Sequence, residues 1–310
     1  MPRSGTPALV HSEFVLTKCD YFVDVQLWPL KADLNPQAWL ENFISAELPH
    51  ATQLLNAFLY FSERMVDEMF VAAFQALSHA VTDPSAPFLA VQNAWRAFVD
   101  AALFTHVTGE VPSTTDSGFA FARRARQLLQ IPEERILTPR DVLMALLAGP
   151  PRPVVFVDDF VGSGNQFIET WERITSVSHT LSLSFKTIAE SRRGDRFFYC
   201  PAFCTEHGLS EIKRRCPPVV VSAAHVLPAR YSVLAHDSLI WPPDLLPSAT
   251  DFVRVASLRA GIPDANGGVD DWRGYHQLGL ALAFGRSIPD ATIPLFYWER
   301  NGWKPLMPRR

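Results

Sequence analysis

The sequence predicts an α/β fold in which a parallel sheet is flanked by helices. A short apolar run, Val154–Val157, is typical of a strand that is buried on both faces. The segments that follow alternate in character: NQFIETWERITSV favours a helix, RFFYCPAFC a strand, HGLSEIKRR a helix and PVVVSAAHV a strand. Because alternating strands and helices are typical of parallel sheets covered by helices, we expect that architecture here.

The first 110 residues are predicted to be mainly helical. From Pro36 to about Val81, apolar residues recur at three- and four-residue steps, as on an amphipathic helix. Two prolines in DPSAP, residues 83–87, end that pattern, because proline cannot continue a helix. FLAVQNAWRAFVDAALFTHV then predicts a helix that ends near Gly109, whereas SEFVLTKCDYFVDVQLW is interpreted as a short strand or hairpin.

The composition suggests three regions: a helical part over 1–110, an α/β core over 111–247 and an irregular extension over 248–310. The core holds two further predicted helices, FAFARRARQLLQI and PRDVLMALLAG, the second closed by Gly149 and a proline. The extension is rich in proline and tryptophan, as in IWPPDLLP and TIPLFYWERNGWKPLMPRR. We expect it to pack on the core.

The bulk composition limits the class of protein. The chain has 310 residues, 48% of them hydrophobic and 19% charged, which suits a globular protein with a large core. The net charge of -4 does not favour a polyanionic partner, and no strong nucleic-acid surface is evident. No apolar run reaches the ~18 residues of a membrane span, and the amino terminus lacks the core of a secretory signal. Four cysteines fit a reducing compartment, so we expect a soluble cytoplasmic protein without a membrane partner.

Two acids follow the predicted strand directly in PVVFVDDFVGSGNQF, residues 153–167. Ligands of open parallel sheets bind beyond the carboxyl ends of the strands, so we expect Asp158 and Asp159 at a binding edge. Alternation along a strand predicts that the two side chains point to opposite sides. Carboxylates beside a phosphate site bind the hydroxyls of a sugar or hold a hard cation such as magnesium.

A glycine-rich turn comes next. Gly162, Ser163 and Gly164 can turn tightly and expose backbone amides, and a helix beginning near Asn165 adds its free amides and the positive end of its dipole. The stretch is not a Walker loop, a dinucleotide fingerprint or a Gly-x-Ser-x-Gly elbow. It predicts an anion cradle beside carboxylates, and a phosphorylated ribose would use both features.

This pattern resembles the phosphoribosyl-pyrophosphate motif of type I phosphoribosyltransferases: apolar residues, two acids, two spacers and a turn of small residues. The resemblance implies a type I phosphoribosyltransferase-like sheet, with Asp158 and Asp159 on the ribose hydroxyls and magnesium bound through the substrate phosphates. It assigns the 5-phosphate to the loop Gly162, Ser163, Gly164, Asn165 and Gln166. The family usually has threonine at the position of Gln166 and a glycine or small residue at that of Asn165. The amide cradle survives both departures, but the hydroxyl contact is lost.

Four segments narrow the resemblance. The segments are WLENF with LLNAFLYFSERMVDEMF, then DSGFAFAR, VVFVDDFVGSGNQ and ATIPLFYWERNGWKPLMPRR. Together they are similar to the phosphoribosyltransferase-like (PRTase-CE type) family of bacterial conflict systems. Members of that family are proposed as effectors beside retrons and related defence modules. The resemblance covers nearly the whole chain. It implies a role in antiviral defence, with a defence-system protein or retron component as partner and nucleotide depletion as one outcome.

A second loop is a candidate for the pyrophosphate. In type I phosphoribosyltransferases a loop ahead of a helix, upstream of the acidic motif, receives this group, and TTDSGFAFARRARQLLQIP has that form. The resemblance assigns Ser117 and Gly118 to the pyrophosphate, with Arg123 or Arg124 adding charge. The alternative is an ordinary surface helix capped by Asp116 or Ser117.

Several other residues invite a functional interpretation. Cys200, Cys204 and Cys216 with His207 do not have the spacing of a known zinc site, and buried thiols behave as small apolar residues. AHDS, residues 235–238, is not expected to form a triad, because triad members meet through the fold. His225 is expected to be partly buried at the end of a strand. The tail tryptophans Trp298 and Trp303 are expected to pack the tail onto the sheet, with stacking on a base as the alternative.

Two function classes remain open. An enzyme would bind phosphoribosyl pyrophosphate or a related ribose phosphate or nucleotide, and would transfer or cleave at the anomeric carbon through an oxocarbenium-like state. A catalytically inactive ligand sensor or partner-binding module would keep only the phosphate cradle, and Asn165 and Gln166 favour that alternative. A third hypothesis is a structural protein whose aromatic tail forms an assembly interface.

Overall fold

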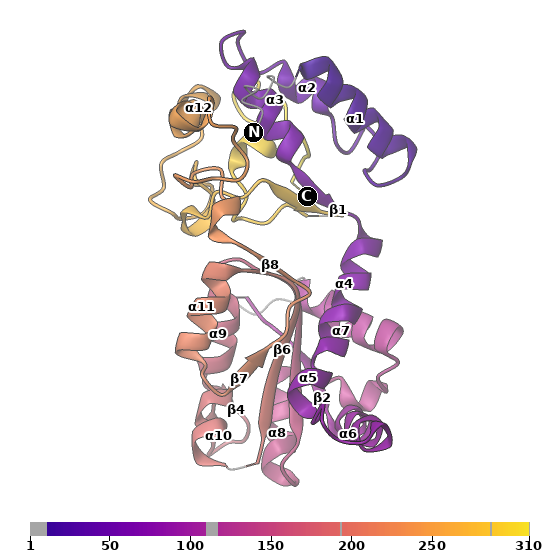
Figure 1. The fold of residues 1–310 in the computed structure, drawn as a ribbon. Coiled ribbons are helices and arrows are strands. Elements are labelled where there is room, and N and C mark those ends of the chain that lie inside the picture. The colour runs from indigo at the N-terminus through magenta and orange to yellow at the C-terminus, as the bar shows by residue number, and fades with distance from the viewer. Residues whose placement is uncertain (1–10, 110–116, 193, 286, 310) are drawn as a thin grey trace. The chain divides into compact units, whose positions relative to one another are not determined.

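The computed structural model describes residues 11–109, 117–192, 194–285 and 287–309, and only the backbone of 117–119. The chain forms two compact units (Figure 1). The first combines Met1–Met65 with Pro228–Arg310, and the second is Val66–Leu227. This division differs from the three regions expected from the sequence, because the two ends of the chain share one core.

The second unit is built on a parallel sheet. Its strand order is β2-β3-β6-β7. Strand β8 also pairs with β6, along residues of β6 that follow those paired with β7. The strands are β2 (Leu103–His106), β3 (Pro153–Val161), β6 (Arg196–Thr205), β7 (Val219–Val221) and β8 (His225–Leu227). All of these pairings are parallel. The predicted parallel sheet is therefore confirmed, although PVVVSAAHV forms two short strands and β2 lies within the region predicted to be helical.

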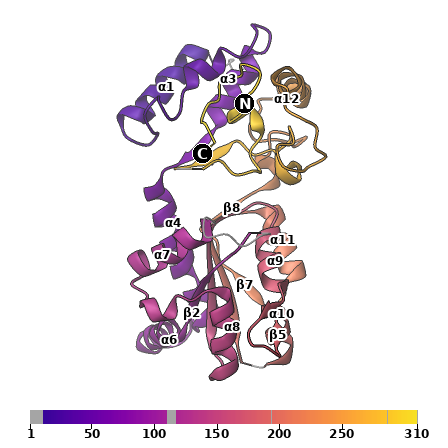
Figure 2. The same ribbon diagram turned by 180° about the vertical axis from the view of Figure 1, so that it is seen from behind.

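Helices cover both faces of this sheet (Figures 1 and 2). One face packs against α4 (Glu63–Ala76), α6 (Phe88–Ala101) and α7 (Ser117–Leu129). There the Phe74 ring lies 5.7 Å from Phe104 of β2, and Phe98 lies 5.1 Å from Phe198 of β6. The other face packs against α8 (Pro139–Ala148), α9 (Asn165–Glu172), α10 (Phe185–Ser191) and α11 (Glu206–Arg215). This is the doubly covered arrangement that buried apolar strands require.

Local sequence explains where several of these helices begin. The Thr138 side chain accepts the amide hydrogen of Asp141 at the start of α8, and Ser184 does the same for Thr187 in α10. Such caps satisfy amides that have no partner within the helix. The remaining short elements of the unit are α5 (Ser78–Val81), η1 (Glu133–Arg135) and the antiparallel pair β4 (Thr175–Ser176) and β5 (Ser182–Leu183).

The first unit joins the two ends of the chain. Its helices are α1 (Ser12–Asp24), α2 (Pro36–Leu40), α3 (Leu48–Ala57) and α12 (Leu246–Ala260), with η2 (Ala229–Tyr231), η3 (Tyr275–Gln277) and η4 (Pro294–Phe296). Strand β1 (Leu59–Phe61) pairs in parallel with β9 (Leu282–Phe284). In its core the Trp39 ring stacks on Phe296 at 5.3 Å, and the Trp39 and Trp303 indoles both donate to the Leu295 carbonyl.

Three predictions about these segments are wrong. SEFVLTKCDYFVDVQLW forms α1 rather than a strand or hairpin, and it buries Val15 and Cys19 one helical turn apart. The pattern from Pro36 to Val81 is not one helix, because β1 separates α3 from α4. The region expected to be irregular contains α12, which buries an apolar stripe including Phe252, Val253 and Ala256.

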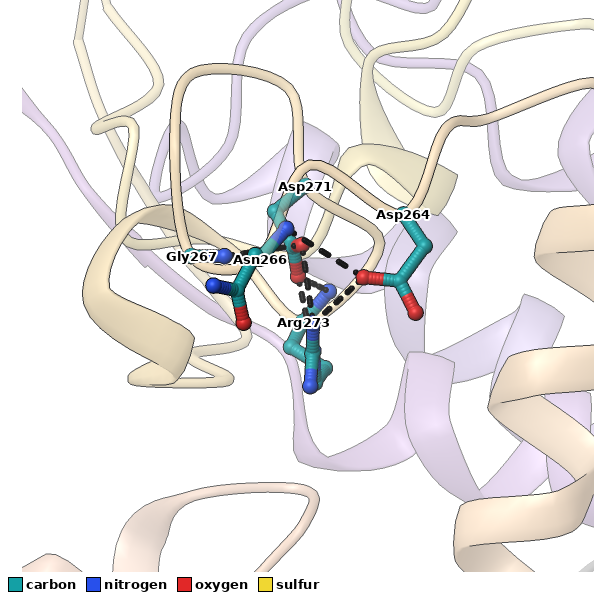
Figure 3. A network of polar contacts seen from close by, with 5 residues as sticks. All are labelled: Asp264, Asn266, Gly267, Asp271 and Arg273. Atoms are coloured by element: carbon teal, nitrogen blue, oxygen red, sulfur yellow. Dashed lines mark hydrogen bonds and ion pairs between the residues drawn. The ribbon is translucent and has the colours of Figure 1, made fainter.

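A buried ion pair organises one loop of the first unit (Figure 3). The fully buried Asp271 carboxylate accepts the backbone amides of Gly267 and Arg273 and two bonds from the Arg273 guanidinium, each at 2.9–3.0 Å. Arg273 also bridges to Asp264 at 2.6 Å. Burial by itself would raise the pKa of Asp271, but these hydrogen bonds favour the carboxylate and lower that pKa to about 2.

Among the residues that the structure describes, none belongs to a helix with both the length and the apolar character needed to cross a membrane.

Candidate functional site

The acid pair lies within strand β3, just past the end of β2. On the β2 side, pairing stops at His106 opposite Val157, so Asp158 is the first residue beyond that neighbour. On the β6 side, pairing continues to Val161 opposite Cys204. The prediction of a strand that ends at Val157 is therefore wrong by four residues, because the long β6 still supplies a partner there. The acids nevertheless lie just past the carboxyl end of the neighbouring strand β2, which is shorter than β3.

Strand β3 is irregular at the acids. Phe156 and Val161 pack in the same apolar core, although residues an odd number apart in a regular strand point to opposite faces. The β3–β6 register pairs Asp158 with Pro201 and then Phe160 with Phe203, and so passes over Asp159. Proline has no amide hydrogen to donate to a ladder, and within sheets it marks such irregular positions.

The two acids interact at this point. The Asp159 amide donates to Asp158 Oδ1 at 3.0 Å, and the charge of Asp159 contributes to raising the pKa of Asp158. The expectation that the two side chains point to opposite sides stays a prediction.

The two acids have different environments. Asp158 is 2% exposed, and its Oδ2 accepts the Tyr199 hydroxyl at 2.7 Å while its Oδ1 accepts the Asp159 amide at 3.0 Å. Burial, and then the charge of Asp159, raise the pKa of Asp158 well above its ordinary value. Asp159 is half-buried, and its Oδ1 accepts the amide of Phe160 at 2.9 Å. Asp158 is thus buried in the protein core, whereas Asp159 is partly exposed at its surface.

The predicted phosphate loop connects β3 to α9, as expected. Gly164 has φ +86°, a left-handed conformation that glycine adopts without strain, and α9 begins at the next residue. The Ser163 hydroxyl accepts the amide of Asn165 at 3.3 Å. Ser163 and Gly164 are buried, Gly162 and Asn165 are half-buried, and Gln166 is exposed. The surface of the loop is therefore formed largely by its two ends.

Helix α11 supports this loop from one side. Thr205 donates from its hydroxyl to the Gly162 carbonyl at 2.5 Å and caps α11 by accepting the amide of Gly208 at 2.9 Å. Gly208 lies so close that an added Cβ would be 2.4 Å from the Gly162 carbonyl oxygen and 2.8 Å from Val161. Sequence reasoning missed these two residues and Tyr199. A threonine between a predicted strand and a predicted helix is a typical helix cap, but nothing in the sequence signals its contact with the loop.

The second predicted loop is only partly described. Residues 110–116, including Asp116, lie outside the described residues, and Ser117 and Gly118 are the first backbone positions of α7. Arg123 is exposed on α7 and lines a pocket of about 370 Å³ together with Ala122, Arg126, Gln127, Glu133 and Ile136. Arg124 instead pairs with Asp67 of α4 at 2.5 Å.

The chain that enters this second loop is tied to α9. The Thr170 hydroxyl accepts the amide of Thr108 at 3.0 Å and donates to its carbonyl at 3.1 Å. Arg173 donates to the Gly109 carbonyl at 2.6 Å. Helix α9 therefore follows the first predicted loop directly and anchors the residues that precede the second.

The remaining candidate residues have structural positions. Cys200, Cys204 and Cys216 are buried free thiols, and burial raises the pKa of Cys204 and Cys216 to about 12. His225 is exposed and stacks on Phe203 at 5.6 Å, so the expectation of a partly buried histidine is wrong. In AHDS the His236 side chain is 96% exposed while Ser238 is buried. Trp298 and Trp303 are buried in the core of the first unit.

A parallel sheet flanked by helices, with an acid pair and then a glycine turn at the start of a helix, defines a phosphoribosyltransferase-like protein. The chain belongs to the PRTase-CE family, whose model matches residues 36–309. The match spans both compact units and confirms the resemblance inferred from the sequence. A search of curated proteins found no match.

Proposed function

We propose that the protein binds phosphoribosyl pyrophosphate, or a related ribose phosphate or nucleotide, at the connection between β3 and α9. The observation that carries this proposal is the short path from the acid pair to the glycine turn. Within one connection the chain offers carboxylates and then the amino-terminal end of α9. These are the groups that sugar hydroxyls and a phosphate need.

Each part of the ligand has a counterpart in this site. The acid pair Asp158 and Asp159 would form the ribose side of the site, and the amides of the loop Gly162–Gln166 would bind the 5-phosphate. The second loop, with Ser117 and Gly118, is the proposed site of the pyrophosphate. Mg²⁺ prefers hard oxygen ligands, such as phosphates and carboxylates. It would be bound through the phosphates of the ligand, near the acid pair, and would neutralise a departing pyrophosphate.

The proposed reaction is transfer or cleavage at the anomeric carbon. Positive charge develops on the ribose in an oxocarbenium-like state, and a carboxylate held beside the sugar stabilises that charge. A protein of this kind would act in the cytoplasm as an effector of a bacterial defence system. It would deplete nucleotides under the control of a partner protein or retron component.

Calorimetry with phosphoribosyl pyrophosphate and Mg²⁺ tests this proposal. The double variant Asp158→Asn with Asp159→Asn should lose affinity by at least about 100-fold, because hydrogen bonds to charged groups contribute strongly and two are removed. Circular dichroism should show an intact fold. The control is Asp251→Asn, which changes one exposed carboxylate of α12 in the other unit. Equal affinity of the double variant and the wild type would refute the site.

A catalytically inactive sensor is the second candidate. Gln166 is exposed at the position where the type I pattern has a threonine, and Asp158 is buried, so the site is better equipped to bind than to turn over. Release of pyrophosphate in the presence of a panel of bases supports an enzyme. Saturable binding without release supports the sensor, and a crystal soaked with the ligand and Mg²⁺ should show density over Gly162–Gln166 in both cases.

A further inference from the structure

Tyr199 connects the two parts of the proposed site. It lies on β6, is 1% exposed, and donates its hydroxyl to Asp158 Oδ2 at 2.7 Å. Its ring stacks on Phe167 with centroids 4.1 Å apart and an interplanar angle of 16°. Phe167 is in the first turn of α9 and directly follows Gln166, the last residue of the loop. One side chain therefore contacts both an acid of the pair and the helix that begins at the loop.

We propose that Tyr199 is a positioning residue of the ribose site: it holds Asp158 in the core, so that Asp159 alone of the pair meets the ligand. This inference rests on the proposed function and divides the roles of the two acids. Asp158 has both oxygens engaged by protein donors and almost no exposed surface. Asp159 is half-buried and directly follows Asp158 in β3, so both acids lie past the last residue of β3 that pairs with β2.

The contacts around Asp158 explain how this buried acid affects its partly exposed neighbour Asp159. Two titratable groups shift the pKa of Asp158: Asp159 on its own strand and Tyr199 on β6. Cys204 in turn contributes to the pKa of Tyr199. From α9 the contact is the apolar ring of Phe167 on Tyr199. Burial, and then the charge of Asp159, raise the pKa of Asp158 and so favour its protonated form. The Asp159 amide donates to Asp158 Oδ1 at 3.0 Å, so Asp158, held by Tyr199, fixes the backbone of Asp159 beside it.

The pH dependence of ligand affinity tests the proposal, with Tyr199→Phe as the variant. In the wild type, affinity should fall at high pH when Asp158 ionises, because a second negative charge then faces the phosphates. The Tyr199 hydroxyl favours the ionised form of Asp158, so its removal raises the pKa of Asp158 further. The alkaline limb of the Tyr199→Phe profile should therefore move to higher pH. At neutral pH the affinity should fall by about threefold to tenfold, the value of one hydrogen bond.

The matched control is Tyr231→Phe. Tyr231 is a partly buried tyrosine of the first unit whose hydroxyl donates to the Ala57 carbonyl at 2.8 Å. This variant also loses a tyrosine hydroxyl and its hydrogen bond, but it should leave the pH profile of ligand affinity unchanged. A Tyr199→Phe profile that matches the control, in a protein that binds the ligand, overturns the role of Tyr199.

Carboxyl ¹³C NMR provides a readout that needs no ligand. In the wild-type protein the Asp158 signal, assigned by its loss in Asp158→Asn, should titrate at a pH above the ordinary value for aspartate. A titration near the ordinary value for aspartate overturns the proposal. If the wild type fails to bind phosphoribosyl pyrophosphate, calorimetry rejects the proposed function, while the same titration in Tyr199→Phe, compared with the wild type, still decides whether Tyr199 acts on Asp158.

Discussion

At the scale of single residues, Asp158 is a carboxyl group that the fold buries at a cost. Its hydrogen-bond partners are a tyrosine hydroxyl and a backbone amide, and burial and then the charge of a second acid, Asp159, raise its pKa. A buried acid without a cation is stabilised best when it carries its proton. Residues kept in such an environment against stability are found at functional sites.

The variant Asp158→Asn should therefore stabilise the ligand-free protein near neutral pH. The folded-state pKa of Asp158 is raised, so its contribution to stability is complete below the ordinary value of 3.8 and is lost as pH rises toward the folded value. Asparagine does not titrate, so the gain should be larger at pH 7 than at pH 4, by about 1.4 kcal/mol for each pKa unit by which the fold raises the pKa of Asp158. Urea unfolding at the two pH values measures the difference. A variant less stable than the wild type at pH 7 contradicts this expectation.

The residues of the site were predictable to different degrees. Asp158, Asp159 and the loop through Gln166 follow from one local stretch, because strand, acids and turn are contiguous. Which acid is buried was not predictable, since Asp158 is covered by contacts with another strand, among them the Tyr199 hydroxyl of β6. Tyr199 was equally hidden, because an aromatic residue in an apolar strand gives no sign of its hydrogen-bond partner.

At the scale of elements, the close approach of α11 to the phosphate loop is the tightest constraint on the site. Replacement Gly208→Ala would normally favour a helix by up to about 1 kcal/mol. Here the added Cβ would lie 2.4 Å from the Gly162 carbonyl oxygen, so the backbone of the loop or of α11 must move. We expect a net loss of about 1–3 kcal/mol in the free energy of unfolding, as in other overpacked cores, and weaker ligand binding.

Thermal unfolding and calorimetry check this prediction, with Gly149→Ala as the control. An added Cβ at Gly149 has its nearest contact at 3.3 Å, from the Ala145 carbonyl oxygen, so that substitution should be much milder. Equal stability and ligand affinity in the two variants would show that α11 does not constrain the loop.

The sequence predicted elements well where their signal is local. Val154–Val157 and RFFYCPAFC form strands because their apolar residues are buried on both sides. Helix α1 was missed because its valines and aromatic residues are typical of strands, and tertiary packing of Val15 and Cys19 overrides that preference. Strands β1 and β9 were missed because each has three residues and a partner at the other end of the chain.

At the scale of the whole molecule, the second unit is one continuous segment with its own sheet and both helical layers. Residues 63–227, expressed alone from the first residue of α4, should therefore unfold cooperatively and bind the ligand with an affinity close to that of the full chain. Circular dichroism and calorimetry test this directly. Failure of that segment to unfold cooperatively would show that the first unit is required for its stability.

The split composition of the first unit has a consequence for biosynthesis. Residues 1–65 leave the ribosome before residues 228–310, yet Trp39 stacks on Phe296 and β1 pairs with β9, both in that later segment. The sheet unit is complete before those partners exist, so it should fold during translation while the amino-terminal segment waits with its apolar side chains uncovered. A stop codon after residue 227 should thus release a protein in which the candidate site is folded, while the amino-terminal segment lacks its partners and depends on chaperones.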